Sequence, residues 1–320
     1  MKLSAMYSFL NTDISIVEKE LERTIQSEYP LLTQASLHLL QAGGKRIRPV
    51  FVLLGGKFGK YDIEYIKKVA VALELIHMAS LVHDDVIDDA ELRRGKATIK
   101  AIWNNRFAMY TGDYIFARSL ELMTSLNNPL AHRILSNTIV EVCRGEIEQI
   151  CDKYRFDQTL KCYLRRIKRK TALLIAVSCQ LGAIAANAPT KIHELLYLFG
   201  YYVGMSFQIT DDILDFIGTE EQLGKPAGGD LLQGNITLPV LFAMEDETAK
   251  AKIVTVSENS SPEEIKEIIS LIKKTGAIEK SYEVSNKYLQ KAFSVLEQLP
   301  KNRARTTLYK IAKYVGKRKF

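Results

Sequence analysis

Residues 69–89 read VAVALELIHMASLVHDDVIDD. The apolar residues of this stretch recur every three or four positions, which is the spacing of one face of an α-helix. The stretch ends in an Asp-Asp-x-x-Asp pattern formed by Asp84, Asp85 and Asp88. Because residues four apart stack on one helix face, Asp84 and Asp88 are expected to project side by side.

A second stretch repeats this pattern. Residues 195–216 read LLYLFGYYVGMSFQITDDILDF and end in Asp211, Asp212 and Asp215. One such cluster could be a solvated helix end, but two copies on apolar helices indicate a shared purpose. Neighbouring carboxylates repel, and Mg²⁺ suits them because it takes one or two carboxylates and completes its shell with water and phosphate. Two clusters facing each other across a bundle would hold magnesium around one diphosphate.

The rest of the chain also reads as helix. Helical spacing occurs in 62–83, 132–150, 163–184, 192–216 and 264–296, and alternating strand patterns are absent. Ser261-Pro262 predicts a helix start, with serine at the N-cap and proline in the first turn. Since no low-complexity linker divides the chain, we predict an all-α fold, one large helical bundle around a central cavity, with residues 1–320 as a single domain.

The composition excludes several classes of protein. Of the 320 residues, 47% are hydrophobic and 25% charged, so the chain is neither disordered nor collagen-like. No apolar run reaches the ~18 residues of a membrane span, and acids near the N-terminus argue against a signal peptide. The four cysteines lack zinc-site spacing. We therefore expect a cytoplasmic protein with reduced thiols.

The net charge of +7 is concentrated in two segments. Residues 301–320 hold eight lysines and arginines and no acid, and residues 161–170 hold six more. A nucleic-acid site would add exposed aromatics or a reader motif, and neither is present. The pattern favours binding of small anions and no nucleic acid. The basic tail is expected to be solvated, with contact to substrate, a partner or an anionic membrane as the alternatives.

Short motifs around the aspartates carry further cations. Arginine offers phosphate a fork of donors and lysine a point charge, so together these residues predict a diphosphate site. They are Lys45, Arg46 and Arg48 in the glycine-loosened turn 43–49, Arg93 and Arg94 after the first cluster, Lys170 beside Thr171, and Lys225 in the glycine-rich loop 224–230.

These motifs resemble those of the trans-isoprenyl diphosphate synthases. The matching pieces follow the family's order and are 43–49, His77, the aspartate clusters, 93–94, 170–171, 207–208, 224–230 and 237–239. Within the family the chain is most similar to the larger, catalytic component of two-component heptaprenyl diphosphate synthases. Asn235 departs from the pattern, because many members carry a phosphate-directed lysine in this segment.

The resemblance implies an isoprenoid synthase fold and a chain-elongating prenyltransferase. An allylic diphosphate, here farnesyl diphosphate, would ionise, and the double bond of isopentenyl diphosphate would attack the cation before a proton leaves. The product would be a long all-trans polyprenyl diphosphate, here heptaprenyl diphosphate for the side chain of a quinone such as menaquinone. The cofactor would be about two or three Mg²⁺ ions. The partner would be a smaller unlike subunit, or a second copy in a homodimer.

The resemblance also implies roles for individual residues. The six aspartates, Lys170 and Lys225 would be catalytic, with Asp84, Asp88 and Asp211 as the direct magnesium ligands. The allylic diphosphate would be held by Arg93, Lys170, Thr171, Gln208 and Lys225. Isopentenyl diphosphate would be bound by Lys45, Arg48, His77 and Arg94. His83 is expected to be structural, and the departing pyrophosphate would take the proton, because no protein base is evident.

Product length can be argued from the helix that precedes Asp84. Ala79 and Ser80 lie one turn below this aspartate, where a growing tail has to pass. Both are small, whereas an aromatic residue would close the path. One turn further down, Ile76 and Leu75 are our candidates for the floor, and we test Ile76. This predicts a product of about six to eight isoprene units. Alternatively, the small residues only allow close helix packing.

Two other functions stay open on sequence alone. A class I terpene cyclase also ionises a prenyl diphosphate with acidic motifs and magnesium, but such enzymes usually lack an isopentenyl-diphosphate clamp like Lys45, Arg48 and Arg94. A non-catalytic scaffold subunit of a prenyl synthase would not need two intact aspartate clusters. A requirement for isopentenyl diphosphate as a substrate distinguishes an elongating synthase from these two alternatives.

Overall fold

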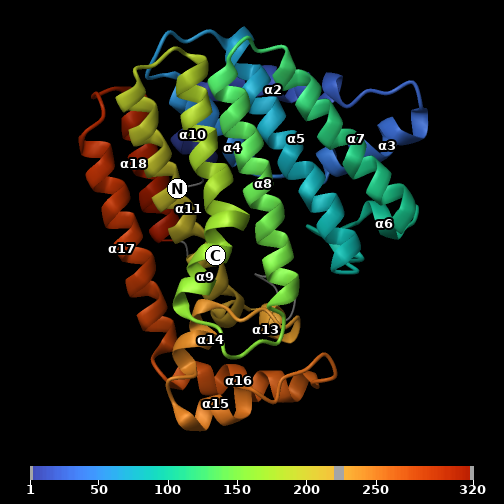
Figure 1. Cartoon of the computed structure of the whole chain (residues 1–320), viewed down its shortest axis with the longest axis vertical. Coiled ribbons are helices and arrows are strands. Elements are labelled where there is room, and N and C mark those ends of the chain that lie inside the picture. The colour runs from blue at the N-terminus through green and yellow to red at the C-terminus, as the bar shows by residue number, and fades with distance from the viewer. Residues whose placement is uncertain (1–2, 220–226, 318–320) are drawn as a thin grey trace. The chain divides into compact units, whose positions relative to one another are not determined.

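The computed structural model describes residues 3–219 and 227–317, and these residues are mainly helical (Figure 1). The strands among them are β1 (Leu92–Arg93) and β2 (Lys96–Ala97), which pair antiparallel with Leu92 opposite Ala97. The all-α prediction is therefore confirmed. No described helix is long and apolar enough to cross a membrane.

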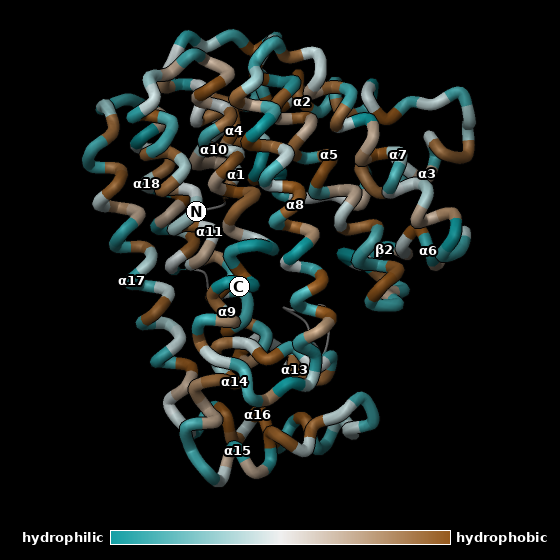
Figure 2. Tube along the Cα trace, viewed as in Figure 1, coloured by the Kyte–Doolittle hydropathy of each residue, from teal (hydrophilic) through white to brown (hydrophobic). Residues whose placement is uncertain are grey.

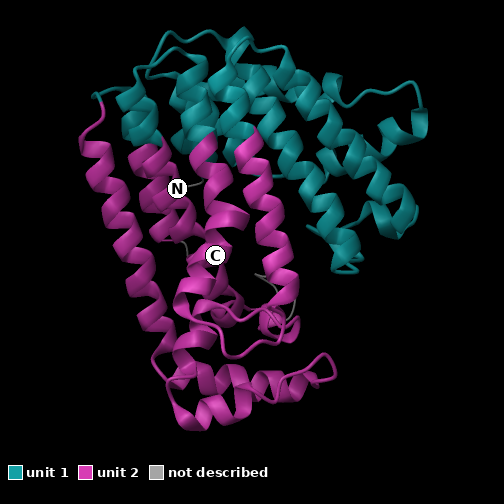
Figure 3. Ribbon diagram, viewed as in Figure 1, with its two compact units in different colours: residues 1–135, 178–196, 300–307 teal, residues 136–177, 197–299, 308–320 magenta. Residues whose placement is uncertain are grey.

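The chain divides into two compact units (Figure 3), and each is described by itself. Unit 1 comprises residues 1–135, 178–196 and 300–307, and unit 2 comprises residues 136–177, 197–299 and 308–320. The helices α8 (Pro129–Cys151), α10 (Leu173–Ala185), α11 (Thr190–Ile217) and α18 (Arg303–Gly316) contribute residues to both. That residues 1–320 form a single domain stays a prediction.

Unit 1 is organised around α5 (Ile63–Ile87), the helix that ends in the first aspartate cluster. All residues from Val69 to Ile76 are buried, so α5 is a core helix along this stretch. It packs against α2, α4 and α7. The remaining elements that lie wholly in unit 1 are α1 (Leu3–Met6), η1 (Ser8–Leu10), α2 (Asn11–Thr24), α3 (Pro30–Gln41), α4 (Ile47–Gly56), α6 (Ile99–Ile102) and α7 (Asn105–Thr124).

Unit 2 contains the second aspartate cluster, at the end of α11. Its core gathers Tyr163, Ile209, Ile213 and Phe216 with apolar residues of the helices that follow. Hydrophobic and hydrophilic residues alternate along these helices (Figure 2), as burial of one helix face requires. Its other elements are α9 (Leu160–Ile167), η2 (Lys168–Ala172), α13 (Gly229–Leu232), α14 (Leu238–Ala243), α15 (Glu247–Ile253), α16 (Pro262–Lys274) and α17 (Ala277–Glu297).

Two predicted helical stretches are interrupted. The stretch 264–296 forms two helices, because Gly276 adopts a left-handed conformation with φ of 75° between them. The stretch 163–184 contains a π-helical turn at Lys168–Ala172. At this turn the backbone of Gly145 approaches Arg169 so closely that a Cβ on Gly145 would lie 2.6 Å from the Cβ of Arg169. The predicted helix start at Ser261 is confirmed by a complete capping box.

Candidate active site

The first aspartate cluster (Asp84, Asp85 and Asp88) lies at the C-terminal end of α5. Asp88 is the C-cap, and its backbone N–H donates to the Asp84 carbonyl at 2.8 Å. Asp85 is only 3% exposed, and burial raises the pKa of its carboxyl. Arg93 opposes this rise, since its Nε and Nη2 lie 2.7 and 2.6 Å from Asp85 Oδ1. In this structure Arg93, predicted to hold the allylic diphosphate, is the counter-ion of Asp85.

Arg94, the second arginine after the first aspartate cluster, lies in a two-residue hairpin turn. Arg94 and Gly95 form the turn between β1 and β2, and both have positive φ, 54° and 76°, as the favoured hairpin turns require. The Arg94 guanidinium donates to the Gly43 carbonyl, and Lys96 Nζ donates to the Gln41 carbonyl at 2.8 Å. The hairpin therefore meets the glycine turn that the sequence predicted to bind diphosphate.

A pocket lies where these two segments meet, and we call it the cationic pocket. It is lined by Gly43, Arg46, Glu74, His77, Arg93 and Arg94, together with Leu39, Ala42, Met78 and Leu81. Two of the four residues predicted to bind isopentenyl diphosphate, His77 and Arg94, line it. Lys45 and Arg48 are not among its lining residues, although the charge of Arg48 acts on His77.

The electrostatics of this pocket favour an anion. Burial lowers the pKa of Arg48 to about 10, and the positive charge of Arg94 contributes. The pKa of His77 is held well below its usual value, first by burial and then by the charges of Arg48 and Arg94. The Nε of Arg48 is buried and has no hydrogen-bond partner among the described residues. An anion such as a diphosphate would relieve this excess of positive charge.

Glu74 is a residue of this pocket that the sequence analysis missed. Its Oε1 accepts from Arg46 Nη1 at 3.2 Å, and Arg46 Nε donates to Glu18 at 2.7 Å. These two carboxylates hold Arg46, which adopts a left-handed backbone with φ of 45°. Glu74 was indistinguishable from a solvated helix residue, because its arginine lies 28 positions earlier in the chain.

In the second aspartate cluster (Asp211, Asp212 and Asp215) neutral donors surround the central carboxylate. Tyr163 Oη donates to Asp212 Oδ2 at 2.7 Å, and Gln208 Nε2 donates to Asp212 Oδ1 at 2.8 Å. Thr171 Oγ1 donates in turn to Gln208 Oε1 at 2.6 Å. The structure thus joins the predicted residues Thr171 and Gln208 in one network. Tyr163, which is fully buried, was missed because it lies in the basic run.

Negative charge is crowded around this cluster. Burial, followed by the charge of Asp230, raises the pKa of Asp212 to about 8. The Asp230 N–H donates to Asp215 Oδ2 at 3.2 Å, which brings the segment after the cluster back to it. Hard carboxylate oxygens gathered in this way fit a divalent cation such as Mg²⁺. No group of three or more described His, Cys, Asp or Glu residues forms a complete metal site.

Several cations of the basic run 161–170 pair with other residues of the chain. Arg166 is buried and donates to Gln158 at 2.6 Å and to the Ile236 carbonyl. Arg169 pairs with Glu141 at 2.8 Å and Glu148 at 2.5 Å. Lys170 Nζ lies 3.0 Å from Glu146. The expectation that this run binds small anions therefore no longer includes Arg166 and Arg169, because both have structural partners.

The remaining predicted residues are placed as follows. Ile76 and Ala79 are buried in α5 at 6% and 2% exposure, and Ser80 Oγ donates to the His77 carbonyl at 2.8 Å. His83 Nε2 lies 3.2 Å from Asp113 Oδ1. Lys225 lies outside the described residues.

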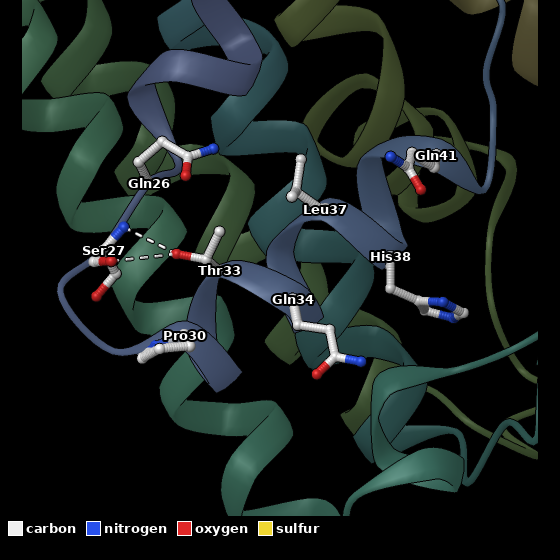
Figure 4. A pocket seen from close by; sticks show the side chains of 8 residues that line it. All are labelled: Gln26, Ser27, Pro30, Thr33, Gln34, Leu37, His38 and Gln41. Atoms are coloured by element: carbon white, nitrogen blue, oxygen red, sulfur yellow. Dashed lines mark hydrogen bonds between the residues drawn. The ribbon is translucent and has the colours of Figure 1, made fainter.

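A different pocket runs along α3 (Figure 4). It is lined by Gln26, Ser27, Pro30, Thr33, Gln34, Leu37, His38 and Gln41. Thr33 Oγ1 accepts from the Ser27 N–H at 2.9 Å, and a ring nitrogen of His38 bonds the Ala97 carbonyl at 2.7 Å. None of the predicted site residues lines this pocket. It also offers no arginine or lysine to balance a diphosphate, so it is not the candidate active site.

Comparison with known proteins gives consistent matches. The polyprenyl synthetase family model matches residues 29–272. The chain is 69% identical to the heptaprenyl diphosphate synthase component 2 of Geobacillus stearothermophilus, over the full length of both chains. The crystal structure of a heptaprenyl diphosphate synthase from Staphylococcus aureus is 46% identical, with a TM-score of 0.94 over 97% of this chain and 99% of the other.

A further solved structure contains ligands. It is a polyprenyl synthase from Caulobacter crescentus in complex with calcium and isoprenyl diphosphate. It is 30% identical, with a TM-score of 0.94 over 100% of this chain and 98% of the other.

Proposed function

The chain belongs to the polyprenyl synthetase family, and from this premise we propose that it condenses isopentenyl diphosphate with an allylic diphosphate, preferably farnesyl diphosphate, to a long all-trans polyprenyl diphosphate. The observation that carries the proposal is the group of positive charges around His77 in unit 1. An elongating enzyme binds two diphosphates, whereas a terpene cyclase ionises one. A cationic pocket beside an aspartate cluster supports the demand for a second diphosphate.

The site residues divide the work by charge. We assign His77, Arg94, Lys45 and Arg48 to isopentenyl diphosphate, because excess positive charge surrounds His77 and Arg48. Thr171 and Gln208 belong to the network around Asp212. We assign them to the allylic diphosphate together with Lys170, Arg93 and Lys225. Breaking the allylic C–O bond builds charge on the leaving diphosphate, and preorganised cations stabilise that charge more than the ground state.

We propose that the magnesium ions are held by Asp84, Asp88 and Asp211, supported by Asp85, Asp212 and Asp215. When bound, Mg²⁺ neutralises and orients the diphosphate. Tyr163 and Gln208 hold both oxygens of Asp212. We therefore assign Asp212 the role of support, and the analogous role in the first cluster goes to Asp85, which is paired with Arg93.

We propose heptaprenyl diphosphate as the product, with Ile76 as the floor of the chain-length path and Ala79 and Ser80 as the small residues above it. The small side chains at the two upper positions and the buried isoleucine one turn below support a long product. The product would supply the side chain of a quinone such as menaquinone. We place the enzyme in the cytoplasm, with peripheral membrane contact for release of this apolar product.

We also propose that a smaller unlike subunit completes the enzyme. The name of the Geobacillus relative includes "component 2". Within unit 2, α8 exposes an apolar stripe in which Val140, Ile147 and Ile150 are 50%, 61% and 50% exposed. Such a stripe on one helix face is typical of a protein contact. A homodimer through the same stripe is the alternative.

A product assay tests the proposed function. The purified chain, alone and with the unlike subunit, is incubated with Mg²⁺, farnesyl diphosphate and labelled isopentenyl diphosphate, and products are sized by chromatography. We expect incorporation of several labelled units per product, and none with Asp84→Ala. A cyclised product without label would favour the terpene cyclase. Activity that survives Asp84→Ala in the complex would favour the scaffold.

A further inference from the structure

Between the first aspartate cluster and Arg93 lie two more acids, Asp89 and Glu91, and one cation contacts both. Lys100 Nζ is 2.5 Å from Asp89 Oδ1 and 2.8 Å from Glu91 Oε1. The Lys100 side chain is only 5% exposed, whereas those of its partners are 85% and 70% exposed. Lys100 Nζ therefore pairs with two carboxylates at the surface, while little of its own side chain is exposed.

The start of α6 fixes Lys100 against this segment. Thr98 is the N-cap, and its Oγ1 accepts from the Ala101 N–H at 3.2 Å. The same oxygen donates to the Ala90 carbonyl at 2.7 Å, and the Thr98 N–H donates to the Glu91 carbonyl at 3.0 Å. Backbone and side-chain bonds therefore connect residues 89–91 to the helix that carries Lys100.

Charge explains why this connection matters for the site. Residues 84–91 contain five acids, Asp84, Asp85, Asp88, Asp89 and Glu91, and like charges at such separations repel. Arg93 offsets Asp85, and Lys100 offsets Asp89 and Glu91. Without Lys100 the two outer acids would repel the cluster. The segment leading to the arginine hairpin would then lose its fixed position.

We propose that Lys100 is a positioning residue that neutralises Asp89 and Glu91 and thereby holds Arg93 and Arg94 in place for a diphosphate. Lys100 itself contacts no substrate and acts through the segment 89–94. The proposal rests on the proposed function only for the identity of the ligand, because the fixed hairpin is a property of the chain alone.

The test compares Lys100→Met with the triple variant Lys100→Met, Asp89→Asn, Glu91→Gln, in which the uncompensated acids are removed. The first readout, without metal or substrate, is the rate of trypsin cleavage after Arg93 and Arg94, which follows the opening of the hairpin. The second is the binding of inorganic pyrophosphate in the presence of Mg²⁺, measured by titration calorimetry. Lys19→Met, at an exposed position of α2, is the matched control.

We expect Lys100→Met to accelerate cleavage and to weaken pyrophosphate binding about tenfold each, the effect of one uncompensated charge pair near the surface. The triple variant is expected to return both values to within about threefold of wild type. If Lys100→Met does not fold, the triple variant is expected to fold, since it removes the two acids that repel the cluster.

Wild-type cleavage and binding in Lys100→Met would overturn the proposal. It would also be overturned by a triple variant that recovers neither value or does not fold, because Lys100 would then act only through packing. Failure of the proposed function is distinguishable, since it would appear as the absence of polyprenyl product in wild type, while the trypsin comparison needs no product.

Discussion

The two aspartate clusters share a sequence pattern but differ in their surroundings. In the first, the buried Asp85 is paired with Arg93, and Lys100 balances the acids that follow. In the second, Asp212 accepts from Tyr163 and Gln208, which are neutral. One motif can therefore be oriented either by counter-charges or by uncharged hydrogen-bond donors. We expect the two clusters to respond differently to substitution.

The largest effect is expected when one proposed metal ligand is removed from either cluster. Asp84→Ala and Asp211→Ala are each expected to lower kcat/KM for elongation by about 10³-fold or more, because transition-state charge on the diphosphate loses its stabilisation. Steady-state kinetics with labelled isopentenyl diphosphate measure this. A variant that keeps more than a tenth of wild-type activity would remove that cluster from the metal site.

The next substitution affects only the first cluster, in which a counter-charge pairs with the buried carboxylate. Arg93→Met leaves the buried Asp85 without its cation and is expected to lower kcat/KM by about 100-fold. Arg93→Lys keeps the charge without the fork of donors and is expected to recover part of the activity. Equal activity of the two variants would show that the charge of Arg93 is unimportant.

The second cluster is tested by removing one hydroxyl. Tyr163→Phe takes one of two donors from Asp212 and is expected to raise the Mg²⁺ concentration for half-maximal activity about tenfold. Tyr309→Phe, at a residue 46% exposed in unit 2, is the control. A Mg²⁺ requirement unchanged from wild type would mean that Gln208 alone orients Asp212.

The two helices that carry the clusters also differ at the positions that we expect to affect product length. The positions four and five residues before the first aspartate are Ser80 and Ala79 on α5, but Phe207 and Ser206 on α11. Ala79→Phe is expected to shorten the product by about one isoprene unit or more, and Ile76→Gly to lengthen it by about one unit, since one helical turn rises 5.4 Å.

Chromatography of the dephosphorylated products measures this, and Phe207→Leu on α11 is the matched control. An unchanged or shorter product from Ile76→Gly would mean that Ile76 is not the floor.

The smallest expected effect concerns pH and the cationic surroundings of the first cluster. The pKa of His77 in the folded chain is well below its usual value, so the unfolded chain binds this proton first. The stability that His77 contributes is present above its unfolded pKa and is lost as the pH falls below it. The loss is at most about 1.4 kcal/mol per pH unit. Urea denaturation at pH 7.5 and 5.5 should show a smaller loss in His77→Gln, and equal losses would contradict the assignment.

Much of the fold could be predicted because helical periodicity is a local signal. The patterns at 62–83 and 192–216 correspond closely to α5 and α11. The break at Gly276 was missed because the apolar spacing continues across it. The π-helical turn was also missed, and Gly145, whose backbone lies close to Arg169 at this turn, is 24 positions away.

The candidate site was predictable only where its residues form contiguous motifs. The aspartates and the arginine pair were proposed from such motifs, but Tyr163 and Glu74 were not, because their partners lie 49 and 28 positions away. Lys100 lies close to the motif in sequence, but its role depends on its contacts with Asp89 and Glu91, which only the structure shows. The residues that orient ligands are therefore harder to predict than the ligands themselves.

The most direct test of the central claim is a calorimetric titration of Mg²⁺ into the chain with a non-cleavable allylic thio-diphosphate. If both clusters bind metal, wild type takes up about two or three ions. Asp84→Ala and Asp211→Ala should each take up fewer. Wild-type uptake in either variant would contradict the claim that both clusters hold the magnesium.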